Sequence, residues 1–325
     1  MDETCTINML KKSADKIGAY LKLDTERLDD VLRNAVVREK SSGYNNQICI
    51  VDFFDSKGGN LGGICLKRAL SKETQSSLVM EADIMELFYL NKVACPRILD
   101  LNTLENNTVY IVMEAVKGNP VNLFDLSSKK IQTILDLIRL HESKLARGIR
   151  NLRSLSPIGN LRGVMDFENK VLMLLAKHVP GFSLEDSLGF LNVYLNDEQT
   201  IRRRTIVTDR SSDNIFQDEN GNIVLIDFST IRIGSQFDNW IQLIDDPRAN
   251  FYFKREDLIK MFFGRNKLDA NILNSFQAAS VYTNLLQGIF TYEKNRNLAA
   301  GYFKNANKSF MKLTNKKNML IRVNH

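Results

Sequence analysis

Two short stretches, Thr208–Asn214 (TDRSSDN) and Leu225–Ser229 (LIDFS), decide how this chain of 325 residues is interpreted. Both lie next to apolar, β-branched runs, which predict a pair of strands at Thr205–Thr208 and Ile223–Ile226. The turn-forming segment Asp218–Gly221 is expected to join these two strands as a hairpin. The polar side chains that border the strands are therefore the first candidates for chemistry.

Three oxygen-bearing side chains stand at these borders. Asn214 follows Asp209 by five residues and Asp227 follows it by eighteen, so we expect the three to converge on one place. Hard divalent cations such as Mg²⁺ take ligands of this kind. Phosphoryl transfer needs a carboxylate to hold the incoming hydroxyl, and an Asn and an Asp to hold the metals on the phosphates. A purely structural role for both aspartates is the alternative, but acids beside apolar strands are costly without a metal or partner.

The chain before these stretches is predicted to be rich in β-structure. Helical periodicity covers the first 33 residues, and a further helix is predicted at 76–93. Strands are predicted at 35–38, 47–54, 64–68, 97–101 and 109–113, the first three of them antiparallel. After Gly118 the pattern becomes helical, with helices predicted at 131–145, 164–177, 184–195 and from 237 onward. The chain thus divides into a smaller β-rich part, 1–117, and a larger helical part, 118–325.

The composition is that of an ordinary globular protein, with 44% hydrophobic and 25% charged residues. No apolar run approaches the roughly 18 residues that a membrane helix needs, so we expect no membrane span. The chain opens with Met-Asp-Glu and shows no secretory signal, which favours a cytoplasmic protein. Four cysteines without a C-x-x-C pair, and only three histidines, argue against zinc chemistry and a histidine-based triad.

The net charge of +6 is a local property of the C-terminal segment. Residues 294–325 contain eight Lys and Arg and no acid, so the rest of the chain carries −2. This tail also contains a helical apolar stripe, with lysines on the opposite face: Leu298, Tyr302, Ala306, Phe310 and Leu313. We expect a helix docked on the core with a solvated basic face. An anionic substrate, nucleic acid or a membrane surface is the alternative, of which nucleic acid is disfavoured.

The loop Asp209…Asn214 and the triplet Asp227-Phe228-Ser229 resemble the catalytic loop and the metal-binding D-F-G motif of the kinase-like superfamily. The resemblance is closer to its branch of aminoglycoside phosphotransferases and choline kinases, and it covers about residues 35–245. It implies an α+β, bilobal protein-kinase-like fold, with a small antiparallel β-sheet N-lobe and a larger, mainly helical C-lobe. Residues 1–117 would then bind the nucleotide, and 118–325 would hold the catalytic loop, the metal loop and the acceptor pocket.

The resemblance also assigns roles within the two stretches. Asp209 would orient the attacking hydroxyl and accept its proton, and Asn214 and Asp227 would hold Mg²⁺. The chain departs from the family pattern in two places. Val207-Thr208 stands where the family has His-Gly or His-Arg, and Ser229 replaces the glycine of D-F-G. The missing histidine weakens the resemblance more than the chemistry, because its role in the family is mainly structural.

Upstream, the resemblance assigns a phosphate ligand and the residue that orients it. Lys67 would bind the α- and β-phosphates, and Glu81 would hold Lys67 in place. Plainer interpretations exist for both residues. Lys67 could be a solubilising residue on an edge strand and Glu81 a solvated helix charge, while Glu86 competes with Glu81 for the lysine.

The remaining nucleotide contacts that the resemblance implies come from the backbone. Glu114 and Val116 lie in a stretch, Val112–Gly118, that looks like the hinge that hydrogen-bonds adenine. In the first hairpin turn, the N–H groups of Ser42 and Gly43 could approach a phosphate, although the G-x-G-x-x-G pattern of a kinase glycine loop is absent.

These assignments predict a phosphotransferase that uses ATP, or GTP, and Mg²⁺ to move the γ-phosphate to a hydroxyl of a small molecule. A small acceptor is favoured because no A-P-E signature, typical of kinases that hold peptides, follows Asp227. Two alternatives remain: a catalytically impaired, kinase-shaped nucleotide-binding module, and a protein-directed kinase. The acids and bases of the helical half do not decide which small molecule would be the acceptor.

Overall fold

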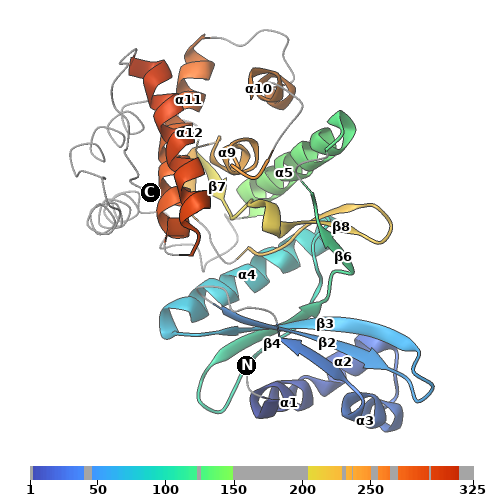
Figure 1. Cartoon of the computed structure of the whole chain (residues 1–325). Coiled ribbons are helices and arrows are strands. Elements are labelled where there is room, and N and C mark those ends of the chain that lie inside the picture. Colours follow the sequence, from blue (N-terminus) through green and yellow to red (C-terminus); the bar gives the residue numbers. More distant parts are fainter. Residues whose placement is uncertain are drawn as a thin grey trace. The chain divides into compact units, whose positions relative to one another are not determined.

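The computed structural model describes residues 3–39, 46–122, 126–148, 204–228, 232–235, 237–249, 255–263, 270–292 and 294–314. They belong to two compact units (Figure 1). The first unit is Met1–Asn119 with Phe216–Ser229, and the second is Pro120–Ile215 with Thr230–His325. Among the described helices, none is long and apolar enough to cross a membrane.

An antiparallel sheet of five strands forms the centre of the first unit, in the order β1-β2-β3-β5-β4. The strands are β1 (Val36–Glu39), β2 (Asn46–Phe54), β3 (Asn60–Ala69), β4 (Ile98–Thr103) and β5 (Val109–Glu114). Because successive side chains of a strand point to opposite faces, Lys67 and Arg68 of β3 serve different faces of the sheet. The two side chains therefore have different surroundings.

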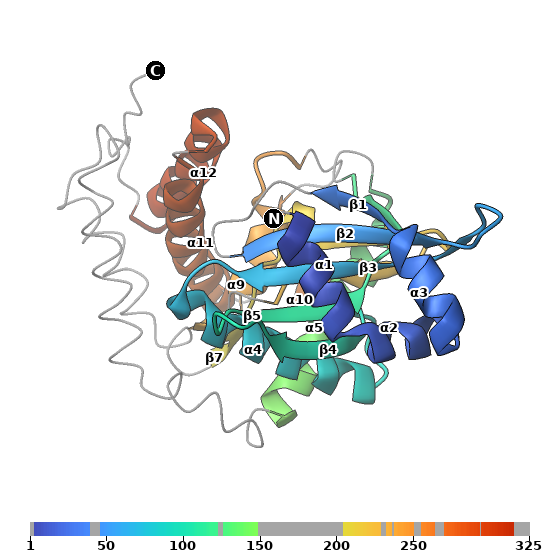
Figure 2. The ribbon, with the colours of Figure 1, turned by 90° about the horizontal axis from the view of Figure 1, so that it is seen from below.

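Helices cover both faces of this sheet (Figures 1 and 2). One face is covered by α1 (Glu3–Lys12), α2 (Ala14–Leu21) and α3 (Thr25–Arg33), and the other by α4 (Lys72–Leu90). Under the three short helices lies a core of fully buried apolar side chains, Met9 and Phe53 among them. Helix α4 begins with a capping box, in which Ser71 and Thr74 each accept a backbone N–H from the other residue.

A smaller sheet of three strands, in the order β6-β8-β9, completes the first unit. Its strands are β6 (Gly118–Pro120), β8 (Ile215–Asp218) and β9 (Ile223–Leu225). The turn from β8 to β9 is closed by the Asp218 carboxylate, which accepts the backbone N–H groups of Asn220 and Asn222.

The predicted hairpin between residues 205–208 and 223–226 is wrong. Strand β7 (Arg204–Val207) pairs with β10 (Arg232–Ser235), and β9 pairs with β8. The turn at Asp218–Gly221 was identified correctly, but the strand that enters it is β8, which begins immediately after Asn214. The sequence prediction joined the two most apolar runs and passed over the short strand between them.

The second unit is mainly helical. Its helices are α5 (Ser128–Gly148), α9 (Asp238–Ile244), α10 (Arg255–Phe263), α11 (Ala270–Tyr292) and α12 (Arg296–Thr314). All seven residues of α9 are buried, polar ones included, so their side chains need partners inside the protein. The helices predicted at 164–177 and 184–195 lie outside the described residues.

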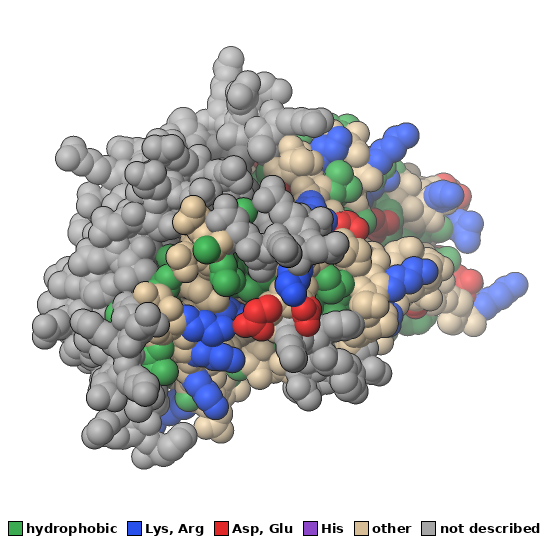
Figure 3. All heavy atoms as spheres, turned by 90° about the horizontal axis from the view of Figure 1, so that it is seen from above, with side chains coloured by type: hydrophobic (Ala, Val, Ile, Leu, Met, Phe, Trp, Pro, Cys, Tyr) green, Lys and Arg blue, Asp and Glu red, His purple; other side chains and the backbone are tan. Residues whose placement is uncertain are grey.

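The C-terminal helix is docked as the sequence predicts. Its apolar stripe, with Tyr302, Ala306 and Phe310 buried, packs α12 along α11. Its lysines are exposed, and Lys312 pairs with Glu256 of α10 at 3.2 Å. Figure 3 shows groups of Lys and Arg side chains close to Asp and Glu side chains on the described surface. A mixed surface of this kind is typical of a solvated helix face.

Candidate active site

A buried ion pair joins β3 to α4 inside the first unit. Lys67 Nζ donates to both carboxylate oxygens of Glu81, at 2.9 and 2.8 Å. Both side chains are almost inaccessible, with 3% of Lys67 and 1% of Glu81 exposed. The plainer interpretations, a solubilising lysine and a solvated glutamate, therefore do not hold. Glu86, the competing partner, is exposed on α4.

Asp227 completes this cluster from the segment that follows β9. Its Oδ1 accepts a third hydrogen bond from Lys67 Nζ, at 2.8 Å. The Asp227 backbone is left-handed, with φ of 60°, which is a strained conformation for a residue with a side chain. The next residue anchors it: Phe228 N–H donates to Glu81 Oε1 at 3.1 Å, and the buried Phe228 ring packs edge-on against Phe88 of α4. These bonds hold the strained residue in place.

The cluster contains one cation and two carboxylates. Burial alone would lower the pKa of Lys67, but the neighbouring charges of Glu81 and Asp227 raise it above its usual value. Burial also raises the pKa of Glu81, against the effect of Lys67 and of the Phe228 N–H. Counted as formal charges, one cation and two carboxylates give the cluster a net −1. It can therefore accept a further cation beside Asp227, whose side chain is 32% exposed.

The other predicted nucleotide contacts of the first unit are only partly described. Glu114 ends β5, where its N–H donates to Arg97 C=O at 2.9 Å, and the next residue, Ala115, donates to Gly63 C=O at 3.1 Å. Val116 lies between β5 and β6 and is half-buried. These two backbone bonds fix the start of the predicted hinge against Arg97, which precedes β4, and against β3. Ser42 and Gly43 lie outside the described residues.

Asp209 and Asn214 lie in the second unit, in the loop between β7 and β8. Asp209 is half-buried, and its Oδ1 accepts the N–H of Ser211 at 2.9 Å. Asn214 ends a 3₁₀ turn, Ser212–Asn214, and its amide donates to Asp209 C=O at 3.4 Å. The loop thus holds these two side chains together. The expected convergence of both with Asp227 remains a prediction, because Asp227 belongs to the first unit.

Helix α9 fixes the backbone on both sides of Asp209. Asn239 Oδ1 accepts the N–H of Thr208 at 3.1 Å. Gln242 accepts the N–H of Arg210 at 2.8 Å and donates to Thr208 C=O at 3.2 Å. These are the partners that the buried polar residues of α9 require. These bonds hold the backbone of the loop next to Val207, which stands where the kinase-like pattern described above has a histidine.

No protein-family model and no curated protein matches this sequence. Solved structures do match. Choline kinase from Cryptosporidium parvum gives a TM-score of 0.60 at 13% identity, over 97% of this chain and 95% of that chain. Aminoglycoside 2'-phosphotransferase-IIIa, as its GDP complex, gives 0.58 at 12%, over 85% and 93%. APH(2")-IIa, in a ternary complex with streptomycin and ATP, gives 0.55 at 16%, over 90% and 98%.

The chain has the kinase-like fold. The fold class predicted from the sequence, an antiparallel sheet followed by a mainly helical part, is therefore confirmed. At 12–16% identity, the similarity to these structures establishes the fold alone. The chemistry has to be inferred from the residues of this chain. The division at residue 117 stays a prediction.

Within the kinase-like fold, sequence reasoning missed the buried support behind the Asp209 loop. The Arg210 side chain is fully buried and lies 3.3 Å from Nδ1 of His141 on α5. Glu142, next to it, accepts from Asn239 at 2.7 Å. Burial lowers the pKa of Arg210 to about 10 and raises that of Glu142 to about 7. An arginine in a polar loop is usually exposed, so only tertiary contacts reveal this cluster.

The sequence favours a loop-capping role for Asp213 over that of a third metal ligand, and in the structure its side chain pairs with an arginine. Its carboxylate accepts two bonds from Arg248, at 3.0 and 2.9 Å, and Arg248 also bonds to the buried carboxylate of Asp246. The loop is thereby tied to the segment that follows α9. Tyr302 of α12 is buried close by, and burial, with the charge of Asp246, raises its pKa.

The residues predicted to hold Mg²⁺ suit that ion chemically. Asn214 and Asp227 offer an amide and a carboxylate oxygen, the hard donors that Mg²⁺ prefers. The two carboxylates around Lys67 favour a cation near Asp227, whose side chain is partly exposed. Among the described residues, no group of three His, Cys, Asp or Glu forms a protein-only metal cage.

Proposed function

We propose that this protein is a kinase that uses ATP or GTP with Mg²⁺ to phosphorylate a hydroxyl group of a small molecule. The buried Lys67–Glu81 pair, bonded to an Asp227 in left-handed conformation, is the observation that carries the proposal. A lysine for phosphates, a glutamate that orients it and an aspartate for metal are the parts that kinases need. The solved structures with the same fold include complexes with GDP, with ATP and with AMP-PNP and Ca²⁺.

Each residue has a distinct task in the proposed reaction. Lys67, fixed by Glu81, binds α- and β-phosphate oxygens in place of its present bond to Asp227. Asp227 and Asn214 would hold Mg²⁺, which would supply positive charge to the phosphates. Asp209 accepts a hydrogen bond from the acceptor hydroxyl, orients its oxygen for attack and takes its proton. The rate gain comes mainly from positioning and charge stabilisation.

The acceptor is proposed to be a small molecule. The kinase-like structures similar to this chain include choline kinase, aminoglycoside phosphotransferases and amicoumacin kinase, all named for small substrates. No A-P-E signature follows Asp227 in the sequence. An aminoglycoside, an amino alcohol such as choline, and amicoumacin are therefore the first acceptors to assay.

The test is acceptor-stimulated release of nucleoside diphosphate by the full chain. Asp209→Asn removes the proton acceptor and should lower the rate by about 10²–10⁴-fold while Mg·nucleotide binding, followed by calorimetry, persists. Asp136→Asn, an exposed aspartate of α5, is the matched control and should keep the wild-type rate. Nucleotide binding without acceptor-stimulated turnover in the wild type would favour the non-catalytic binding module, and equal turnover in wild type and Asp209→Asn would contradict the role of Asp209.

A further inference from the structure

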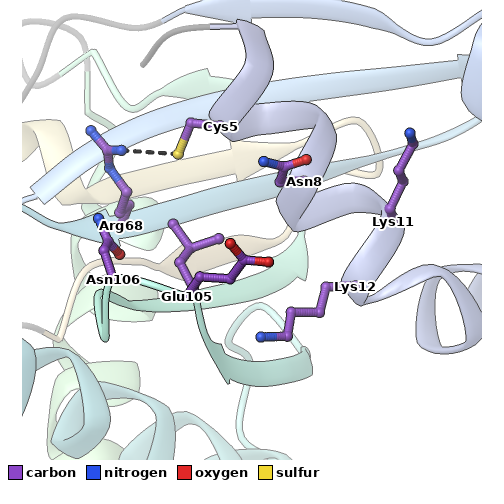
Figure 4. Close-up of a pocket in the computed structure, with 8 residues that line it drawn as sticks. Cys5, Asn8, Lys11, Lys12, Arg68, Glu105 and Asn106 are labelled. Carbon is purple, nitrogen blue, oxygen red and sulfur yellow. Dashed lines mark hydrogen bonds between the residues drawn. The ribbon is translucent and has the colours of Figure 1, made fainter.

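A cavity lies on the face of the sheet that α1 covers (Figure 4), whereas Lys67 serves the opposite face. Its volume is about 650 Å³, within the range of small-molecule sites in proteins. Its walls are α1, β3 and the β4–β5 turn, all in the first unit. No role in the proposed phosphoryl transfer falls on these residues.

The cavity is lined by hydrogen-bond donors and by an excess of positive charge. Three basic residues, Lys11, Lys12 and Arg68, face a single acid, Glu105. Asn8 adds an amide from α1, and Figure 4 shows it on the helix that faces Arg68. Donors on facing walls, together with a net charge of +2, suit an anionic ligand.

Arg68 is the central residue of this site. Its guanidinium donates to Gln47 Oε1 at 2.6 Å and to Cys5 Sγ at 2.9 Å. Both partners are side chains without a formal charge, and the buried Arg68 Nε has no hydrogen-bond partner among the described residues. Because neither partner is charged, the positive charge of the half-buried guanidinium is not neutralised and remains available to a ligand. Its planar set of donors matches phosphate oxygens.

Lys12 provides a second fixed cation on the facing wall. Its ammonium donates to the backbone C=O of Thr103, which ties α1 to the end of β4. An ammonium group has three N–H donors, so two remain for a ligand. The adjoining turn is closed by two backbone bonds between Leu104 and the residues that follow, Leu104 N–H to Thr108 C=O and Asn107 N–H to Leu104 C=O, both 2.9 Å. The walls are therefore preorganised.

We propose that this cavity is a binding site for a small phosphate monoester, such as a sugar phosphate. A phosphate monoester carries about two negative charges at neutral pH, which matches two fixed cations on opposite walls. The volume of the cavity exceeds the needs of the phosphate group alone and accommodates an organic part of sugar size. Because Arg68 follows Lys67 on β3, the ligand would bind directly behind the proposed nucleotide site.

Cys5 gives a readout that is specific to this cavity. The thiol lines the cavity and contacts Arg68, so a ligand that fills the site should protect it from alkylation by iodoacetamide. The full chain is titrated with ribose 5-phosphate, and labelling of the Cys5 peptide is followed by mass spectrometry, with Cys65 as internal reference. Labelling should slow by a factor of 1 + [L]/Kd. Ribose without phosphate should not protect.

Charge variants identify the site. Arg68→Gln and Lys12→Gln should each weaken the Kd, taken from the concentration dependence, by at least about tenfold. Glu105→Gln should tighten binding, because it removes the one acid. Lys16→Gln removes an exposed lysine of α2 outside the cavity and should leave the Kd unchanged.

Three results would overturn the proposal: no concentration-dependent protection of Cys5 in the folded wild type, equal protection by ribose, or unchanged protection in the variant that combines Lys12→Gln and Arg68→Gln. Circular dichroism establishes that each variant is folded. If Arg68→Gln does not fold, Lys12→Gln decides, because Lys12 is exposed on the surface of α1.

Discussion

The ammonium group of Lys67 bonds to two carboxylates at once, and this arrangement makes a prediction about stability. Lys67→Met leaves Glu81 buried with its charge unpaired and should reduce the free energy of unfolding by about 3–5 kcal/mol. Glu81→Gln, added to that variant, should recover part of the loss, because a neutral amide is cheaper to bury. Urea unfolding of both single variants and of the double variant measures this coupling.

A surface pair provides the control for this cycle. Lys260 and Asp257 of α10 are 3.3 Å apart and 42% and 49% exposed, so Lys260→Met should change stability by less than about 0.5 kcal/mol. Strictly additive losses at Lys67 and Glu81 would show that the buried pair is not coupled in the folded protein.

Glu142 predicts a pH dependence of stability. Its pKa is raised from 4.5 to about 7, chiefly by burial, so the folded protein binds a proton there that the unfolded chain loses. The stabilisation by the protonated form is complete below 4.5 and is lost as pH rises through about 7. Glu142→Gln keeps an acceptor for Asn239 and removes the titration. Between pH 4.5 and 7.5 the melting temperature should therefore fall less in Glu142→Gln than in wild type.

The other charges around Glu142 are unchanged in this comparison. Arg210 and Arg139 lower its pKa through their charges, and His141 lies in contact with Arg210. The difference between the wild-type and Glu142→Gln curves isolates the contribution of Glu142. Parallel curves would assign the pH dependence to another group.

At the residue scale, sequence reasoning found the chemistry-bearing side chains and missed their supports. Lys67 and Glu81 could be named because their residue types, order and spacing resemble a known pattern, and the structure pairs them. Choosing Glu81 over Glu86 requires knowing which face of α4 points to Lys67. The sequence does not reveal this, because α4 is only weakly amphipathic. Arg210 and Gln242 act through contacts with residues distant in the sequence, which no local pattern encodes.

At the scale of elements, Gly118 shows where the backbone of β6 needs glycine. Its φ is 155°, and a Cβ there would lie 2.1 Å from the backbone oxygen of Gln217 in β8. Because backbone atoms cannot swing aside, Gly118→Ala should destabilise the protein by about 3 kcal/mol. Gly58→Ala is the matched control: its φ is 79° but no atom lies within 4 Å, so only backbone strain of about 1–2 kcal/mol is expected. Equal decreases in melting temperature for Gly118→Ala and Gly58→Ala would contradict the close approach of Gly118 to the backbone of Gln217.

The elements themselves were predicted unevenly, and residue composition explains the difference for the short strands. The strands of the large sheet were predicted within a few residues. Strands β6, β8 and β10 have three or four residues each and at most one β-branched residue, whereas β7 and β9 are equally short but mostly β-branched. The two most apolar runs were therefore paired with each other, whereas the structure pairs each with a short strand.

At the scale of the whole molecule, the order of the elements along the chain carried the fold prediction. Although the sequence matches no family model, its elements follow the kinase-like order of strands, a helix, strands and then helices. The order of strands within the large sheet could not be predicted the same way. Strand β5 lies between β3 and β4, a choice set by packing against α4 and not by neighbouring sequence.

The last prediction concerns nucleotide and metal together, as a property of the whole folded chain. A ligand that binds only the folded state at a hundred times its Kd adds about 2.7 kcal/mol, or several degrees in melting temperature. We expect this shift with Mg·ATP or Mg·GTP and a much smaller one when EDTA removes the metal. Asp227→Asn should abolish the difference that Mg²⁺ makes, because it removes the metal-binding charge, while asparagine tolerates the left-handed backbone at this position. Asp136→Asn should behave as wild type. A shift that does not depend on Mg²⁺ in wild type, or an Mg²⁺ effect retained by a folded Asp227→Asn, would refute the metal role of Asp227.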